Sequence, residues 1–327
     1  MVGARRQHRI RRAAVAGPAD LDLVVVGHTN LDHFFHVEQL PATDRTVPLR
    51  NREVRLGGTA ANIARAASRL GVRVSLASQV GPDFPPHFRR LLVQEGVDLT
   101  AFQTVHRARS PACFIVESAG GEQVTLIDQG PMGRDLGVPV PSTLLARAGW
   151  VHLATGDPGY QLRVLAEARR LGLRVAADPA QEIHYRWKPE PLRRLLGGSE
   201  LFFANRGELS RALELLQLKG VPDLLEIVPM VIETRGASGA RAWTRAGAVK
   251  VRPTRPRKVQ QVTGAGDGFR GGFYAGWFRG DAIQKCLEYG GWAAARWLET
   301  GGPEGLRPRG PRRPAIPDLR DADRRGD

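Results

Sequence analysis

Short apolar runs that alternate with amphipathic segments constrain most strongly how this chain can fold. Residues 23–27, Leu-Val-Val-Val-Gly, have the composition of a buried strand that a glycine ends. From Gly57 the pattern becomes helical, with Ile63 and Leu70 on one face and Gly71 as a stop. Further strands are predicted at 72–77, 150–154, 173–177, 201–204 and 228–232, and further helices at 160–171, 189–196 and 206–216. This alternation predicts an α/β fold with a mainly parallel sheet that helices cover.

Residues 32–56 and 101–130 interrupt this alternation. They carry strand-like patterns without an intervening helix, for example at 113–116 and 123–128. These segments predict a small separate sheet. Placed at the carboxyl ends of the main strands, such a sheet would act as a lid that excludes water from reacting groups. Ordinary antiparallel edge strands explain the pattern equally well.

The length and composition of the chain allow a compact enzyme. The 327 residues, 42% of them hydrophobic, suffice for a large α/β domain or two smaller ones. We expect the folded domain at 21–305, between a basic, disordered extension at 1–20 and a disordered tail at 306–327. The two cysteines form no metal or disulfide pattern, and no apolar run is long enough to span a bilayer. A cytoplasmic protein without a membrane partner is therefore expected.

The net charge of +15 raises the question of nucleic-acid binding, because a basic surface gains affinity when counterions leave the phosphates. Much of the excess is arginine scattered through predicted helices and loops, and five arginines crowd residues 5–12. The sequence contains no zinc finger, RNP-like aromatic motif or basic zipper. Nucleic acid is not expected as the main ligand, whereas the same charge would attract an anionic nucleotide.

Residues 263–269 place a carboxylate among small residues, where a strand-rich region passes into an apolar helix. Glycines let the main chain approach an anion closely, and the first N–H groups of a helix carry partial positive charge. The backbone at Gly264, Ala265 and Gly266 can therefore bind phosphate. Asp267 can then accept the proton of a hydroxyl that attacks the phosphoryl group. An ordinary helix N-terminus, with Asp267 favouring the dipole, explains these residues equally well.

Two motifs near the N-terminus suggest an acceptor site. Asn30 and Asp32 follow the first strand at the edge where open sheets bind ligands, and their side chains can bind a diol. Gly57 and Gly58 open a helix and expose N–H groups at close range, with Asn62 one turn further on. Capping of a turn by Asn30 or Asp32, and a plain helix start, remain alternatives.

Two motifs in the second half suggest a nucleotide site. Asn205 and Glu208 start a helix directly after a buried strand, in the spacing of a capping box. The same oxygens would suit a hydrated Mg²⁺, which binds few protein oxygens beside waters and phosphates. Thr234, Gly236 and Gly239 follow another buried strand, where they suit either a tight hairpin or a wall beside a nucleotide.

Other phosphate-binding patterns fit less well. Gly266, Gly268 and Gly271 match the spacing of a dinucleotide-binding loop, which makes a Rossmann-type oxidoreductase a distant alternative. That loop belongs in an early strand–turn–helix unit with an acidic residue about 20 positions further on, whereas this one lies late and contains Asp267. A Walker-type loop is absent, because no Gly-Lys-Ser or Gly-Lys-Thr occurs.

Taken together, these motifs resemble the signatures of the ribokinase-like (PfkB) family of sugar and nucleoside kinases, over roughly residues 21–302. Residues 57–71 are similar to the family's first signature and residues 263–273 to its second, in the right order and separation. The resemblance implies a three-layer ribokinase-like fold, with a mainly parallel central sheet flanked by helices and a small β-sheet lid. It also implies ATP and Mg²⁺ as cofactors.

The resemblance assigns a role to each motif. Asp267 would be the general base for the acceptor hydroxyl, and the backbone of Gly264, Ala265 and Gly266 would be the anion hole. The residues that would hold the acceptor are Asn30, Asp32, Gly57, Gly58 and Asn62. The residues that would border ATP, or organise Mg²⁺ through water, are Asn205, Glu208, Thr234, Gly236 and Gly239.

Within the family, three features are more similar to prokaryotic nucleoside kinases of the adenosine, inosine-guanosine or cytidine type than to ribokinase. They are residues 155–158 (Thr-Gly-Asp-Pro), residues 178–181 (Asp-Pro-Ala-Gln) and Arg270. The resemblance therefore implies a nucleoside partner whose ribose 5′-hydroxyl is the acceptor, with Arg270 among the substrate-binding residues. A sugar kinase of the ribokinase or fructokinase type is the alternative. A monomer or a homodimer is expected.

Two positions depart from the family pattern. Gln261 stands where members commonly carry an aspartate, three residues before the first glycine of the second signature. In relatives that aspartate helps to bind a monovalent cation, so potassium activation is not implied for this chain. Gly290-Gly291-Trp292 occupies a helix where relatives often have an asparagine, which leaves the adenine contacts unassigned.

Overall fold

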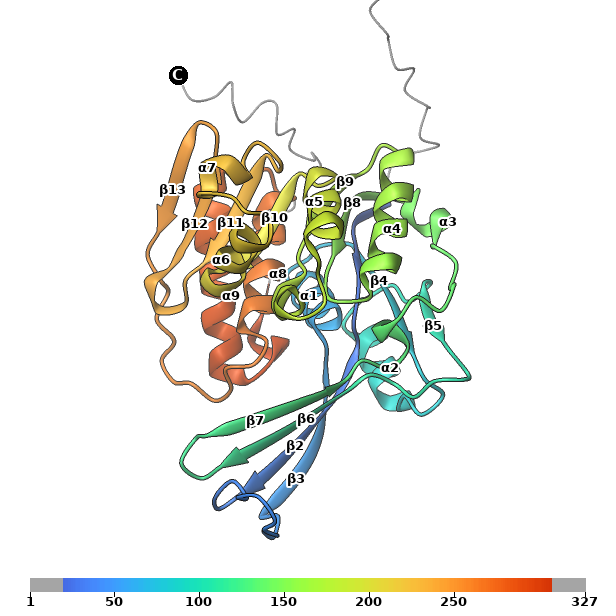
Figure 1. Cartoon of the computed structure of the whole chain (residues 1–327), viewed down its shortest axis with the longest axis vertical. Helices are drawn as coiled ribbons and strands as arrows, with labels where there is room; N and C mark the ends of the chain where they lie inside the picture. Colours follow the sequence, from blue (N-terminus) through green and yellow to red (C-terminus); the bar gives the residue numbers. More distant parts are fainter. Residues whose placement is uncertain (1–19, 308–327) are drawn as a thin grey trace, which may run out of the picture.

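The computed structural model describes residues 20–307, which form two sheets (Figure 1). The strands of the larger sheet are β1 (Leu21–Val26), β4 (Val74–Val80), β5 (Phe102–Thr104), β8 (Ala148–Leu153), β9 (Arg174–Ala177), β10 (Leu201–Asn205), β11 (Met230–Thr234), β12 (Ala240–Thr244) and β13 (Gly247–Val251). Their order is β13-β12-β11-β10-β9-β8-β1-β4-β5. Neighbours from β11 to β5 pair in parallel, and β12 and β13 add an antiparallel edge. The predicted α/β fold is confirmed.

Helices cover both faces of this sheet, which gives three layers. One helix layer contains α1 (Thr59–Arg69), α2 (Pro86–Gln94), α8 (Ala265–Trp277) and α9 (Ile283–Thr300). The other contains α3 (Ser142–Leu145), α4 (Pro158–Arg170), α5 (Pro189–Gly197), α6 (Arg206–Leu215) and α7 (Val221–Leu224). Successive side chains of a strand point to opposite faces, so Leu23 and Val25 pack in the first core, and Val24 and Val26 pack in the second.

The small sheet projects from the body at the bottom of Figure 1. It consists of β2 (Asn30–Val37), β3 (Asn51–Gly57), β6 (Ala112–Ser118) and β7 (Gln123–Asp128), in the order β3-β2-β6-β7. The pair β2–β6 is parallel, and the two outer pairs are antiparallel. The prediction of a separate small sheet is therefore confirmed over ordinary edge strands. Its predicted second segment, 101–130, begins too early, because β5 pairs with β4 in the large sheet.

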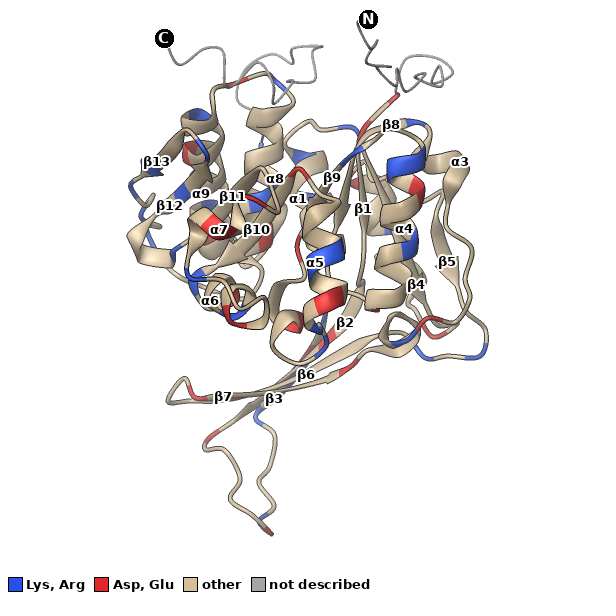
Figure 2. Cartoon of the chain, turned by 45° about the horizontal axis from the view of Figure 1, so that its top comes forward, with Lys and Arg blue, Asp and Glu red and all other residues tan. Residues whose placement is uncertain are grey.

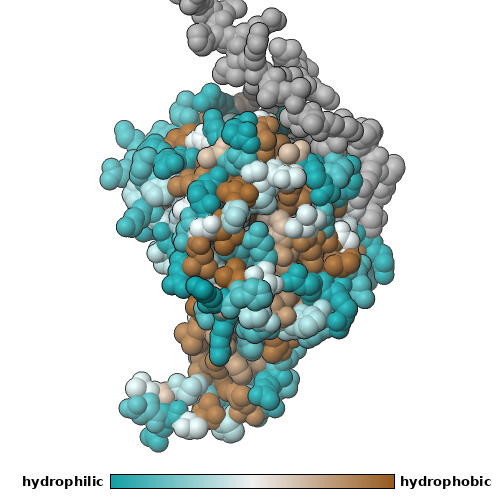
Figure 3. All heavy atoms as spheres, turned by 90° about the vertical axis from the view of Figure 1, so that its right-hand side faces the viewer, coloured by the Kyte–Doolittle hydropathy of each residue, from teal (hydrophilic) through white to brown (hydrophobic). Residues whose placement is uncertain are grey.

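The register gives the small sheet two different faces. Asp32 lies opposite Arg55 of β3 and Cys113 of β6, so these three side chains share one face. The other face is apolar and exposed, with Val54 47% exposed and Leu126 61% exposed. Figure 3 shows apolar side chains gathered on this narrow part of the molecule.

Figure 2 shows Lys and Arg spread over many helices and loops, with Asp and Glu between them. No helix in the described part is both long and apolar enough to cross a membrane.

The predicted extension at 1–20 and tail at 306–327 lie almost entirely outside residues 20–307. Leu306 is buried in the first core, so the folded part continues past the predicted end at 305. The part of the chain that the structure describes also contains four short 3₁₀ helices: η1 (Gly130–Gly133), η2 (Ala180–His184), η3 (Gly236–Ser238) and η4 (Pro303–Gly305).

Candidate active site

The predicted phosphate-binding turn caps helix α8. Gly264 is the N-cap residue, with a φ of +85° in the left-handed region. A Cβ atom at this position would lie 2.6 Å from the ring of Trp297. The indole Nε1 of Trp297 also donates a hydrogen bond to the carbonyl of Thr263, at 2.9 Å. This tryptophan of α9 therefore fixes the backbone of the turn, and both its ring and the dihedral angle require glycine at 264.

The start of α8 leaves backbone N–H groups for an anion. Ala265 and Gly266 are the first two residues of the helix, and N–H groups of the first turn lack partners within a helix. The N–H of Ala265 makes a long bond of 3.4 Å to the carbonyl of Val262, and Gly268 makes a regular helical bond of 2.9 Å to Gly264. This end of the α8 dipole can receive a phosphoryl group.

Asp267 lies half-buried in the first turn of α8. Its Oδ2 accepts a hydrogen bond of 2.9 Å from Nδ2 of Asn62, a residue of α1. Burial raises the pKa of Asp267 to about 7; Arg270 and the Asn62 bond lower the pKa, and Asp178 and Asp32 raise it. A carboxylate with a pKa near neutrality, oriented by an amide, is suited to accept a proton.

The predicted acceptor residues of β2 are buried and incompletely bonded. Asn30 is 7% exposed and Asp32 is 8% exposed, and Oδ1 of each lacks a hydrogen-bond partner among the described residues. Burial raises the pKa of Asp32 to about 7, although Arg55 lowers it. Gly57 faces this carboxylate, and a Cβ there would lie 1.9 Å from Oδ2 of Asp32. Gly58 is the N-cap of α1. Buried oxygens without partners fit a polar ligand such as a diol.

A cleft of about 240 Å³ opens beside these residues. Asp32, Asn62, Gln261, Thr263 and Trp297 line it, so the small sheet, α1 and the turn meet there. Its other lining residues are Phe34, Val54, Arg55, Leu56, Arg65, Phe88, Leu91, Gly301, Gly302 and Glu304. Within the cleft the amide of Gln261 donates a hydrogen bond of 3.3 Å to Oγ1 of Thr263.

Arg270 lies behind the turn, and its predicted contact with the substrate stays a prediction. The side chain is 5% exposed and forms a bidentate ion pair with Asp178, in which Nη2 lies 2.7 Å from Oδ1. Its Nη1 donates to the carbonyl of Gly266 at 3.0 Å. Asp178 also contacts Nε2 of His152 at 3.2 Å, and Nδ1 of His152 lies 2.7 Å from the hydroxyl of Tyr274. Because this buried network occupies the guanidinium, Arg270 anchors α8 instead of lining the cleft.

The predicted nucleotide residues lie at the carboxyl ends of β10 and β11. Asn205 and Thr234 are direct partners across these strands. Asn205 and Glu208 form a complete capping box, with bonds of 2.9 Å from Glu208 N–H to Asn205 Oδ1 and 2.7 Å from Asn205 N–H to Glu208 Oε2. Gly236 lies in η3 and Gly239 directly after it, in the turn between β11 and β12. The capping alternative is therefore correct for Asn205 and Glu208.

These residues can still hold a hydrated magnesium ion. Glu208 is buried, and burial raises its pKa while the Arg270 cation lowers it. The capping box uses Oε2 of Glu208, which leaves Oε1 for a water ligand of Mg²⁺. Within residues 20–307, no group of three or more His, Cys, Asp or Glu side chains forms a direct metal cage. The donor set suits a cation held mostly by water and phosphate oxygens.

Sequence reasoning missed three residues that support the site: His152, Tyr274 and Trp297. His152 and Trp297 reach the turn or its anchor from other elements of the fold, so no local pattern marks their roles. One weak signal was present, because Arg270 and Tyr274 are four positions apart and therefore share a helix face.

The known proteins that are similar to this chain are kinases. The family described as pfkB family carbohydrate kinase matches residues 20–308. The chain is 31% identical to a nucleoside kinase of Methanothermobacter thermautotrophicus, over 86% of this chain and 91% of that protein. It is 29% identical to an ATP-dependent ribose-1-phosphate kinase of Halopiger xanaduensis, over 86% of this chain and 92% of that protein. The crystal structure of Methanocaldococcus jannaschii nucleoside kinase, an archaeal member of the ribokinase family, superposes with a TM-score of 0.79 at 28% identity, covering 89% of this chain and 96% of that one.

Proposed function

The chain belongs to the pfkB family of carbohydrate kinases, and we propose that it transfers the γ-phosphoryl group of ATP to the 5′-hydroxyl of a nucleoside. Family membership makes it an ATP-dependent kinase and removes the oxidoreductase alternative. Two relatives named nucleoside kinase, at 31% and 30% identity, support the choice of a nucleoside. We also propose that the small sheet is a lid over the acceptor.

The observation that carries this proposal is the hydrogen bond between Asn62 and Asp267 beside the glycine turn. Asp267 accepts the proton of the acceptor hydroxyl while the hydroxyl oxygen attacks the γ-phosphorus. The new O–P bond forms as the bond between the γ-phosphorus and the bridging oxygen breaks, and ADP leaves with that oxygen. Asn62 keeps the carboxylate oriented, so the reacting atoms are already positioned.

The backbone of Gly264, Ala265 and Gly266 is proposed to bind the transferring phosphoryl group, because the α8 dipole favours the charge that develops there. Arg270 supports this anion hole from behind through its bond to the Gly266 carbonyl. Asn30 and Asp32 would hold the ribose diol with their unpaired oxygens, and Gly57 and Gly58 would let the sugar approach the backbone closely.

We propose that ATP lies along the edge formed by β10 and β11, bordered by Asn205, Thr234, Gly236 and Gly239. Glu208 and Asn205 would hold the magnesium ion through water. When bound, that ion would neutralise charge on the phosphates.

A phosphorylation assay with ATP and Mg²⁺ tests the proposed function. The panel contains adenosine, inosine, cytidine, D-ribose, ribose-1-phosphate and fructose. Turnover should be fastest with a nucleoside. The identity to a ribose-1-phosphate kinase makes a sugar acceptor the second candidate, and turnover confined to ribose, ribose-1-phosphate or fructose would establish it instead.

A further inference from the structure

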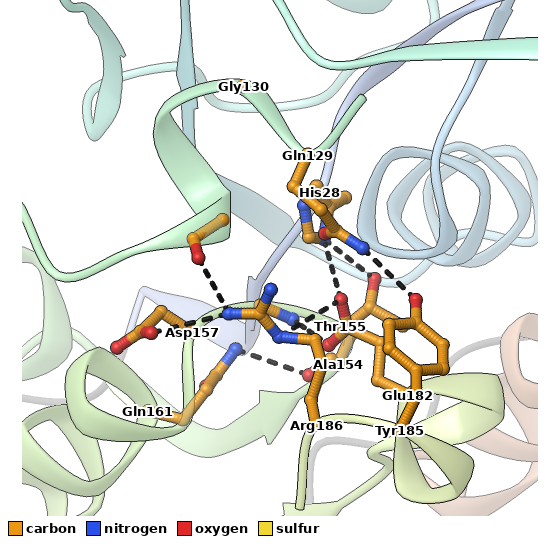
Figure 4. A network of polar contacts seen from close by, with 12 residues as sticks. His28, Gln129, Gly130, Ala154, Thr155, Asp157, Gln161, Glu182, Tyr185 and Arg186 are labelled. Atoms are coloured by element: carbon orange, nitrogen blue, oxygen red, sulfur yellow. Dashed lines mark hydrogen bonds and ion pairs between the residues drawn. The ribbon is translucent and has the colours of Figure 1, made fainter. Parts of the chain in front are cut away.

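A polar network lies where the small sheet joins the main body (Figure 4). Gln129 directly follows β7, two residues after Ile127. Ile127 pairs with Cys113, and Cys113 pairs with Asp32. Since directly paired residues and residues two apart point to the same side, Gln129 continues the face of the small sheet that carries Asp32. This side of the small sheet is directed toward the candidate acceptor site.

Tyr185 approaches Gln129 from the main body. It directly follows η2, and its side chain is 57% exposed. Its hydroxyl accepts a hydrogen bond of 3.0 Å from Nε2 of Gln129 (Figure 4). Burial and the charge of Glu182 raise the pKa of Tyr185, and the Gln129 hydrogen bond lowers it. The ring therefore stands across from that face.

The turn that carries Tyr185 is strained. Ala180, the first residue of η2, has a φ of +47° although it has a side chain, and it is buried. Such backbone conformations are concentrated at ligand sites, where surrounding contacts hold them. Here Glu182 supplies one such contact by accepting a hydrogen bond of 2.6 Å from the Gly156 N–H.

The Gln129 amide has a defined orientation. Its Nε2 donates the hydrogen bond to the hydroxyl of Tyr185. The opposite atom, Oε1, is buried and has no hydrogen-bond partner among the described residues. A buried acceptor without a partner is the kind of group that a ligand donor satisfies.

We infer that Tyr185 and Gln129 recognise the base of the nucleoside in the acceptor site. This inference rests on the proposed function. With the 5′-hydroxyl at Asp267 and the ribose diol at Asp32, the base must extend further along the same face. There the ring of Tyr185 stacks on the base, and Oε1 of Gln129 accepts a hydrogen bond from a base N–H. The pair thereby selects nucleosides over free sugars, and bases with an N–H donor over bases without one.

Calorimetric binding of adenosine, inosine and D-ribose to Tyr185→Ala, Tyr185→Phe and wild type tests the ring. Loss of stacking should weaken nucleoside binding by roughly 10- to 100-fold in Tyr185→Ala. Tyr185→Phe, which keeps the ring, should stay within about 3-fold of wild type. The affinity for D-ribose and the KM for ATP should not change, and Val93→Ala, at an exposed position of α2, controls for surface substitution.

Purine riboside, which lacks the 6-amino group, tests the amide. Wild type should bind adenosine more tightly than purine riboside, and Gln129→Leu should remove this preference. Equal affinities of wild type for adenosine and purine riboside, or nucleoside binding unchanged in Tyr185→Ala, would overturn the inference. The proposed function would still hold if wild type phosphorylates a nucleoside. Failure of wild type to phosphorylate any nucleoside would instead refute the proposed function, and this inference with it.

Discussion

Replacing Asp267 with Asn removes the proposed base while preserving the shape of the side chain. The amide oxygen of the new side chain can still accept the bond from Asn62, so the turn should remain intact. General-base catalysis contributes about 10² to 10⁴ in rate, so we expect kcat to fall by that factor. The KM for ATP should change little, because the anion hole is backbone.

The same substitution should stabilise the protein in a pH-dependent way. Burial raises the pKa of Asp267 from 3.8 to about 7, so between these values the folded state binds more protons than the unfolded state. Stability is then lost as the pH rises through this window. A pKa difference of about three corresponds to about 4 kcal/mol, which we reduce to about 2 kcal/mol because the carboxylate is half-buried. Asp267→Asn should therefore be about 2 kcal/mol more stable than wild type at pH 8, and the two should converge near pH 4.

Urea denaturation at pH 4.5 and pH 8 measures the difference in free energy of unfolding, and steady-state kinetics from pH 5 to 9 measure the rate. For wild type, kcat/KM should rise with pH through about 7, and the variant should lack this rise. Asp44→Asn is the matched control, because Asp44 is exposed and asparagine tolerates its positive φ. A variant with wild-type kcat would show that Asp267 is not the general base, and no gain in stability at pH 8 would show that burial does not raise its pKa.

Two further substitutions test the support of the turn. Gly264→Ala should reduce kcat strongly and cost more than about 2 kcal/mol, because the new Cβ adds an overlap with Trp297 to a left-handed backbone. Gly121→Ala, with a φ of +83° and open surroundings, should cost only about 1 to 2 kcal/mol, and equal losses in urea denaturation would contradict the role of Trp297. Arg270→Met should destabilise the protein by about 3 to 5 kcal/mol, because it leaves Asp178 buried without its cation. Exposed Arg170→Met should cost under about 1 kcal/mol, and a similar cost for both would argue against the anchor.

Local patterns were sufficient to predict strands β1, β4 and β8 to β11 of the large sheet and most of its helices, but not β5, β12 or β13. The apolar runs at 23–27 and 201–204, for example, lie within or overlap β1 and β10, because a strand buried on both faces needs apolar residues at every position. The order of strands and the pairing of β5 with β4 depend on contacts between distant segments. Because local patterns do not show that β5 pairs with β4, the predicted lid segment began about ten residues before β6.

The site also combines residues that a local pattern predicts with residues that only the folded chain brings together. The backbone of residues 264–266 and the position of Asp267 follow from a local turn, so sequence reasoning could place them. The bond between Asn62 and Asp267 joins residues 205 positions apart, and the ion pair of Arg270 with Asp178 joins residues 92 positions apart. Only the folded chain shows that Arg270 points into the interior and pairs with Asp178.

We propose that a nucleoside 5′-hydroxyl receives the γ-phosphoryl group at Asp267. Incubation with γ-³²P-labelled ATP, Mg²⁺ and the best nucleoside, followed by separation and phosphorus NMR of the product, tests it directly. The label should appear in the nucleoside 5′-monophosphate, in equal amount to the ADP formed, and Asp267→Asn should reduce both together. Label confined to inorganic phosphate, or found on a free sugar or another hydroxyl, would contradict the account.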